Sequence, residues 1–258
     1  MFVAPQGRSL RNSFQLLSAL TGRELHLRYQ GSVFGWAWSL IRPLALAAIL
    51  TFALGRVLRT DITGVFLIVG LFPWFWFQGS VGMATTTFVG NGGLLKKVRF
   101  PRAILPLSVV FGNTLQFLLA VPVLIGFVIG YGNNPTWEWI VALPLLFLIQ
   151  LALITGVALF VASVTTFVRD LEHIVEVLLT FLFYGTPIIY STDLIPSDYR
   201  WITWVNPLAP LMEGWRTVLL DGNFPDEHLL AAAGMAAVAV VIGWFTFRAL
   251  EDSFADVV

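Results

Sequence analysis

The residues that most often carry catalytic chemistry are few in this chain and far apart. Its three histidines, His26, His173 and His228, are widely separated in the sequence, and there is no cysteine. Such a set favours neither a serine-type triad nor a metal site, and it excludes thiol chemistry. Residues 92–97 contain two glycines and two lysines, but they lack the Gly-Lys-Ser/Thr ending of a phosphate-binding loop. The sequence therefore predicts no catalytic centre and no ATPase site within the chain.

A short cationic segment, residues 91–102, could instead bind another protein. Within seven of its positions lie four basic residues, namely Lys96, Lys97, Arg99 and Arg102. Basic residues between nearby membrane spans mark the cytoplasmic side of the membrane. Apolar side chains, including Leu94 and Leu95, are interspersed among the basic residues, which makes the segment amphipathic. We predict a cytoplasmic loop that can dock on a soluble partner.

Composition places the chain in a membrane. Of its 258 residues, 57% are hydrophobic and 12% are charged, whereas soluble domains carry about 25% charged residues. Six apolar stretches are long enough to cross about 30 Å of hydrocarbon. They lie near residues 33–55, 64–89, 104–131, 138–168, 172–190 and 229–250. The central portions of these stretches contain almost no ionisable residue, whereas an ion-coupled carrier needs intramembrane charge. An external energy source is therefore expected.

The distribution of Lys and Arg orients the six predicted spans. With both termini in the cytoplasm, eleven basic residues lie inside: Arg8, Arg11, Arg23, Arg28, Arg42, Lys96, Lys97, Arg99, Arg102, Arg169 and Arg248. Four lie outside: Arg56, Arg59, Arg200 and Arg216. This asymmetry follows the positive-inside rule, and the reverse orientation violates it equally strongly.

Two segments outside the predicted spans have different patterns. Residues 8–30, within an N-terminal segment 1–30, predict an amphipathic helix in the membrane interface, either a plain anchor or a surface for a partner. This segment lacks the long apolar run of a cleaved signal. On the outer side, residues 191–227 are rich in Trp and Pro, and 208–220 are apolar but too short to span. We expect short re-entrant or interfacial helices there.

Aromatic side chains cluster in the middle of the second predicted span. Trp74, Phe75, Trp76 and Phe77 are consecutive and lie away from the membrane interface, where Trp usually concentrates. Aromatic faces can pack on sugar rings, but packing between helices explains such residues equally simply. Because residues three apart share a helix face, Trp74 with Phe77 is the preferred pair for a substrate route. The further candidates for this route are Tyr184 and Tyr190.

Taken together, four segments resemble the permease subunits of ABC-2 type transporters, specifically polysaccharide exporters. They are residues 28–38 with the following Pro43-Leu44, residues 91–108, Arg169-Asp170-Leu171 with 186–190, and 206–208 leading to Arg216. Segment 91–108 is the most specific. Two positions depart from the usual pattern, because Arg102-Ala103 replaces an Arg-Glu pair and Arg42 replaces a small polar residue.

The resemblance implies an all-α integral membrane protein with six spans in a domain covering residues 31–258, placed in the bacterial cytoplasmic membrane. Two copies would form one pathway above two copies of a separate ATPase, which would hold the ATP and magnesium. This chain would need no cofactor of its own and no nucleic acid. The implied interface-helix residues are Arg23, Glu24, Arg28 and Tyr29. The implied coupling residues, in a loop at 90–102, are Asn91, Leu94, Leu95, Lys96, Lys97 and Arg99.

The substrate implied by the resemblance is an undecaprenyl-linked glycan, with an O-antigen-like polymer as the first choice. Teichoic acid or capsular polysaccharide is the near alternative, and a drug or lipid is a more distant one. A secondary carrier or channel would need paired intramembrane carboxylates or an inverted repeat, and the sequence contains neither. A membrane glycosyltransferase would need an acidic metal or nucleotide site, for which the predicted cytoplasmic loops are too short.

Overall fold

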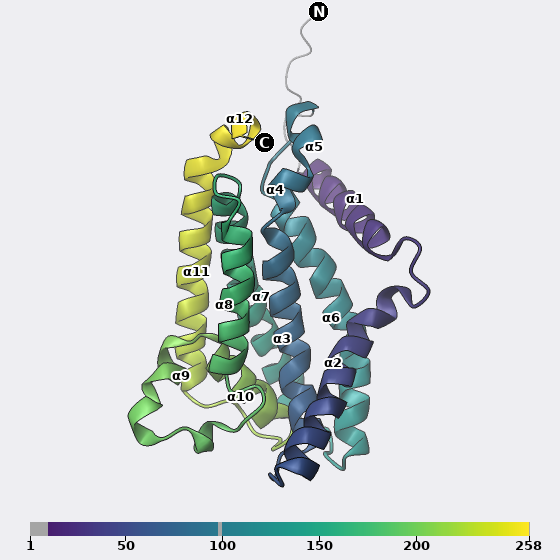
Figure 1. Cartoon of the computed structure of the whole chain (residues 1–258), viewed down its shortest axis with the longest axis vertical. Coiled ribbons are helices and arrows are strands. Elements are labelled where there is room, and N and C mark those ends of the chain that lie inside the picture. The colour runs from purple at the N-terminus through teal and green to yellow at the C-terminus, as the bar shows by residue number, and fades with distance from the viewer. Residues whose placement is uncertain (1–9, 98–99, 258) are drawn as a thin grey trace, which may run out of the picture.

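The computed structural model describes residues 10–97 and 100–257, and every regular element in these ranges is helical (Figure 1). The α-helices are α1 (Leu10–Tyr29), α2 (Trp38–Leu50), α3 (Gly64–Ala84), α4 (Thr87–Gly90), α5 (Gly92–Lys97), α6 (Ile104–Gly130), α7 (Glu138–Thr165), α8 (Leu171–Gly185), α9 (Trp201–Val205), α10 (Leu208–Leu219), α11 (His228–Leu250) and α12 (Phe254–Val257). A π-helical segment, Thr51–Val57, continues α2. Short 3-10 turns lie at Gly35–Ala37, Thr192–Leu194, Ser197–Tyr199 and Glu251–Ser253.

Five helical segments in the described ranges are long and apolar enough to cross a membrane. They are Gly35–Val57, Gly64–Ala84, Ile104–Gly130, Glu138–Thr165 and His228–Ser253. The fold is thus the multi-pass, all-α membrane protein that the sequence predicts. The predicted fifth span, 172–190, does not meet this criterion. Its helix α8 has 15 residues, or about 22 Å at about 1.5 Å per residue, because the chain leaves helical geometry at Thr186-Pro187.

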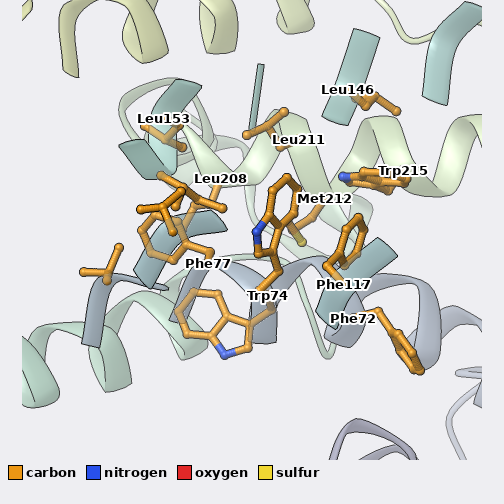
Figure 2. Packing of buried hydrophobic residues seen from close by; sticks show 14 of the residues in the cluster. Phe72, Trp74, Phe77, Phe117, Leu146, Leu153, Leu208, Leu211, Met212 and Trp215 are labelled. Atoms are coloured by element: carbon orange, nitrogen blue, oxygen red, sulfur yellow. The ribbon is translucent and has the colours of Figure 1, made fainter. Parts of the chain in front are cut away.

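Helix α3 is the centre of the bundle, with α2, α6, α7, α8 and α10 around it (Figure 1). It is apolar on all sides, as expected for a helix surrounded by other helices. Gln150 of α7 is fully buried and links three helices: its Nε2 donates to the carbonyl oxygen of Pro73 at 2.8 Å, and its Oε1 accepts from Trp215 Nε1 at 2.8 Å. Figure 2 shows apolar side chains of α3, α7 and α10 packed against one another.

The closest helix crossing joins α7 and α11. A Cβ at Gly243 would collide with the backbone of Gly156, and a Cβ at Gly156 would collide with the backbone of Ala239. Small residues let two backbones approach closely, which is the usual way for membrane helices to gain packing contacts. This crossing fixes α11, and with it the C-terminal segment that follows.

The elements divide between two ends of the bundle. Helices α1, α4, α5 and α12 gather at one end, and α9 and α10 lie at the opposite end (Figure 1). The apolar segment predicted at 208–220 is indeed a short helix, α10, and ten of its twelve residues are buried. The amphipathic segment predicted at 8–30 is a helix as well, and α1 packs against α6.

Candidate functional site

The end that carries α5 contains the residues expected to couple to a partner. Asn91 precedes α5, and its backbone oxygen accepts from the amides of Leu94 at 2.9 Å and Leu95 at 3.1 Å. Its side chain donates to the carbonyl oxygen of Thr87 at 2.9 Å and accepts from Arg23 Nη1 at 3.3 Å. Asn91 therefore begins the helix and ties it to α1. Neither link was predicted from the sequence.

The side chains of α5 do not all face outward. Lys96 and Lys97 are exposed and Leu94 is half-buried, so these three can meet a partner. Leu95 is 7% exposed and belongs to the apolar core of the subunit. Its side chain is thus packed within its own chain, and the expectation that Leu95 contacts a partner stays a prediction. Arg99, also expected at the contact, lies outside the described residues.

The C-terminal segment covers this end of the bundle, which sequence reasoning missed. Phe254 of α12 is fully buried, and its ring centroid lies 4.4 Å from that of Phe88 and 5.8 Å from that of Phe247. Helix α12 also contacts α5, and Leu95 of α5 is buried. A single aromatic residue four positions beyond the end of α11 gives no periodic signal, so only the folded chain reveals this cover.

Helix α1 is seated on α6 by polar contacts as well as apolar ones. Thr21 Oγ1 donates to the carbonyl oxygen of Ser108 at 3.4 Å, and Arg28 Nη1 donates to Asn113 Oδ1 at 3.1 Å. Burial lowers the pKa of Arg28, against the weaker raising effect of nearby Tyr29 and Glu24. Of the residues expected on this helix, Arg23 is exposed, whereas Glu24, Arg28 and Tyr29 are half-buried.

The aromatic run of α3 is mostly internal. Trp74 is 1% exposed and packs on Phe183 of α8 at 5.5 Å between centroids. Phe77 is 3% exposed (Figure 2). Trp76 stacks on Phe117 at 4.5 Å, and its Nε1 donates to Thr114 Oγ1 at 3.1 Å. Burial thus favours packing roles for these residues, and the preference for Trp74 with Phe77 as the pair that lines a substrate route stays a prediction.

Phe75, Tyr184 and Tyr190 are the route candidates with accessible side chains. Phe75 is half-buried, Tyr184 is 62% exposed, and Tyr190 is half-buried with its hydroxyl donating to the carbonyl oxygen of Tyr184 at 3.0 Å. Tyr184 belongs to α8, in which Leu179 is the buried residue. Most of α8 is therefore open to contact with a partner, a substrate or a second copy.

The opposite end contains a buried arginine that the sequence placed simply on the outer side. Arg216 of α10 is 5% exposed, and it donates to the carbonyl oxygens of Pro187 at 2.5 Å and Ile188 at 2.6 Å. Its guanidinium carbon lies 3.6 Å from the ring centroid of Phe66. The side chain therefore holds the chain where α8 ends. The sequence feature that could have indicated this buried position is an arginine within an apolar helical pattern.

Several known proteins are similar to this chain in amino-acid sequence. Residues 15–220 match the family described as ABC-2 type transporter. The chain is 35% identical over 246 residues to an O-antigen export system permease protein RfbA of Klebsiella pneumoniae, covering 95% of each chain. It is 34% identical over 259 residues to a protein of the same name from Myxococcus xanthus, covering 96% of this chain and 98% of that protein. A polysialic acid transport protein KpsM of Escherichia coli is 25% identical over 247 residues, covering 92% and 94%.

The match covers most of the chain and includes α3, α5, α8 and α10. The chain belongs to the ABC-2 type transporter family. The resemblance stated from residues 91–108 and the three other segments is thereby confirmed.

Proposed function

We propose that this chain is the transmembrane subunit of an exporter that moves a lipid-linked, O-antigen-like polysaccharide across the bacterial cytoplasmic membrane. The observation that carries the proposal is the identity of 34–36% to O-antigen export permeases over at least 95% of the chain. Two copies of the chain form the pathway, and two copies of a separate ATPase, which bind ATP and magnesium, drive it. The carrier lipid is undecaprenol.

The geometry of the α5 end supports coupling to the ATPase. Leu94, Lys96 and Lys97 are accessible on a short helix, and Asn91 links this helix to α1 through Arg23. A push on α5 is therefore transmitted to α1, and from α1 to α6 through the Arg28–Asn113 contact. On this proposal the α5 end faces the cytoplasm, together with α12. The positive-inside distribution of Lys and Arg supports the same orientation.

The exposed surface of α8 supports a contact with a second copy of the chain and a substrate route beside that contact. Phe181 is 71% exposed and Tyr184 is 62% exposed, although α8 runs beside α3 and α7 in the bundle. Large apolar surfaces of this kind mark contact sites. We propose that α8 with residues 186–190 completes a sixth crossing, and that α9 and α10 are re-entrant at the outer side.

The experiment is deletion of the gene for this chain in its native bacterium. We expect the lipid-linked polymer to accumulate inside the cell and to return to the surface when the chain is supplied again. Supplying it with an ATPase whose phosphate-binding lysine is replaced serves as the control and should not restore export. Surface polymer that is unchanged by the deletion would refute the proposed substrate.

Alanine substitutions in α3 distinguish a residue that lines the substrate route from a residue that packs against other helices. Trp74→Ala should lower the amount of folded subunit, because removing a buried aromatic costs about 3–5 kcal/mol. Phe75→Ala should lower export per folded subunit more than it lowers the amount of subunit. Quantitative immunoblotting and surface polymer are measured together. Equal losses of folded subunit, with normal export per subunit, would leave Phe75 without a route function.

A capsular polysaccharide is the second candidate substrate. The chain is 25% identical to a polysialic acid transport protein over 92% of its length. Chemical analysis of the polymer that accumulates in the deletion strain distinguishes the two, because the repeating units differ.

A further inference from the structure

A cavity of about 390 Å³ opens between α1, α2, α3 and α6. Arg28 lines it from α1, Arg42 from α2, and Asn113 and Gln116 from α6. Trp38 is also part of the wall and is 50% exposed. The cavity therefore combines two guanidinium groups with amides and aromatic rings.

The charges around the cavity are of one sign. Its lining contains two arginines, and among the described residues that line it there is no carboxylate. Glu24 lies outside the lining, and its Oε1 forms an ion pair with Arg28 at 3.9 Å from Nη2, which is too long for a hydrogen bond. An anion in the cavity would thus be attracted by both arginines, while Glu24 offsets part of the charge of Arg28.

The hydrogen-bonding groups point to the same ligand. Arg28 Nε and Nη2 and Gln116 Nε2 are buried and lack a hydrogen-bond partner among the described residues. All three atoms are donors. Buried donors without partners are costly and call for an explanation, such as an acceptor that completes them. A phosphate group offers several acceptor oxygens, and arginine binds such groups in a two-pronged geometry.

The position of the cavity favours a lipid-borne phosphate. It lies beside α1 and between helices α3 and α6, which are long and apolar enough to cross a membrane. Trp38 borders it, and Trp concentrates at the level of lipid headgroups. Arg42 is exposed, so the cavity can be reached from outside the bundle. A headgroup can therefore enter sideways while its lipid tail stays in the membrane.

We propose that this cavity binds the phosphate or diphosphate group that joins the glycan to its carrier lipid. The assignment rests on the proposed function, since it names the part of that substrate which the subunit recognises. Arg42 contacts the anion from the accessible side of the cavity. Arg28 and Gln116 donate hydrogen bonds to the anion from the inner side. Asn113 positions Arg28 through its 3.1 Å hydrogen bond.

The test uses the complex of this chain with its ATPase in nanodiscs of zwitterionic lipid. The probe is radiolabelled undecaprenyl diphosphate without sugar. Arg42→Gln should raise the dissociation constant about tenfold, the effect of losing one charge-assisted hydrogen bond. Arg169→Gln is the matched control, because Arg169 is an equally exposed arginine outside the cavity, and its affinity should not change. Arg28→Lys keeps the charge and should still weaken binding, because lysine lacks the planar fork.

Competition separates the possible sources of phosphate. Inorganic pyrophosphate and phosphatidylglycerol, each at the concentration of the probe, should leave most of the probe bound. Equal competition by either one would overturn the assignment to the carrier lipid. Normal binding by both Arg42→Gln and Arg28→Lys would overturn the cavity as the site, even where the wild type exports polymer normally. Failure of the proposed function shows separately, as absent polymer export by the wild-type complex.

Discussion

The two ends of the subunit each hold a largely buried arginine, and the two differ in how many of their donors are used. Arg216, at the α10 end, donates to two backbone carbonyls and lies over the ring of Phe66. Arg28, at the α1 end, makes one hydrogen bond, to Asn113, and two of its nitrogens lack partners among the described residues. The first arginine is used to hold the fold together. The second has donors that the described residues leave unpartnered, as the proposed anion site requires.

Replacing Arg216 should cause the largest change in stability. Arg216→Met leaves the carbonyl oxygens of Pro187 and Ile188 without their donors in a buried region. Leaving a buried acceptor without its partner costs about 1–3 kcal/mol for each group. We expect a marked fall in the thermal unfolding temperature of the detergent-solubilised subunit, together with a lower yield.

The matched control for this change is Arg200→Met. Arg200 lies at the same end of the subunit, but it is exposed and donates to the carbonyl oxygen of Ile195 at 3.3 Å. It should change the unfolding temperature little, because exposed polar contacts contribute little. An Arg216→Met subunit as stable as the Arg200→Met subunit would remove the contrast between the two ends.

Within the α5 helix, a buried and an exposed residue should respond differently. Leu95→Asp places a carboxylate in the subunit's own core and removes apolar packing, at a cost of about 3 kcal/mol or more. Lys97→Glu alters an exposed side chain and should leave the folded amount unchanged while lowering export. Measuring folded subunit and surface polymer together separates these effects. Normal yield with Leu95→Asp would mean that α12 does not cover this residue in the membrane.

The helices were largely predictable because membrane spans leave a strong signal. Predicted boundaries such as 104–131 and 138–168 lie within three residues of α6 and α7. The exception is the stretch 172–190. Its apolar residues continue past Gly185, but Pro187 has no backbone N–H to donate, and Arg216 and Asn206 bind the chain there instead. Hydropathy measures composition and cannot show where the backbone bonds of a segment go.

The candidate site was predictable only in part. The exposed lysines of α5 follow from a local pattern, whereas the burial of Leu95 depends on α12, which is more than 150 residues away in sequence. The cavity beside Arg28 also depends on residues from four helices. Arg42 appeared from the sequence as a departure from the family pattern, but its neighbours could be found only from the fold.

Two glycines of α3 allow the two arginines to be compared further. Gly70 lies against Arg216, and Gly79 lies against Asn113, which accepts from Arg28. A Cβ at Gly70 would lie 2.8 Å from Arg216 Nη2 and 3.2 Å from the carbonyl oxygen of Ile188. Because this side chain is held by two hydrogen bonds, we expect Gly70→Ala to cost about 2 kcal/mol through overpacking. A Cβ at Gly79 would lie 3.1 Å from Asn113 Oδ1, which borders the cavity, so a shift of this oxygen by a few tenths of an ångström relieves the contact.

Gly79→Ala should therefore leave the unfolding temperature nearly unchanged, since alanine also favours the helix. It should weaken binding of undecaprenyl diphosphate instead, because the oxygen that positions Arg28 is displaced. Unfolding temperature and binding are measured on both variants. The contrast would fail if Gly70→Ala were harmless, or if Gly79→Ala destabilised the subunit as strongly.

The smallest effect is expected at Asn91, where the α5 end is held by exposed contacts. Asn91→Ala removes the acceptor for Arg23 and the donor to Thr87, while the backbone oxygen of residue 91 still accepts from α5. The net loss is about 1 kcal/mol, which corresponds to about fivefold faster hydrogen exchange at the amides of α5. Asn133→Ala is the control at the other end, where the amide donates to the carbonyl oxygen of Val128 at 3.4 Å. It should leave α5 exchange unchanged. Unaltered exchange in Asn91→Ala would mean that α5 is held to the bundle by Leu95 and α12 alone, so that movement of α5 would not reach α1 through this contact.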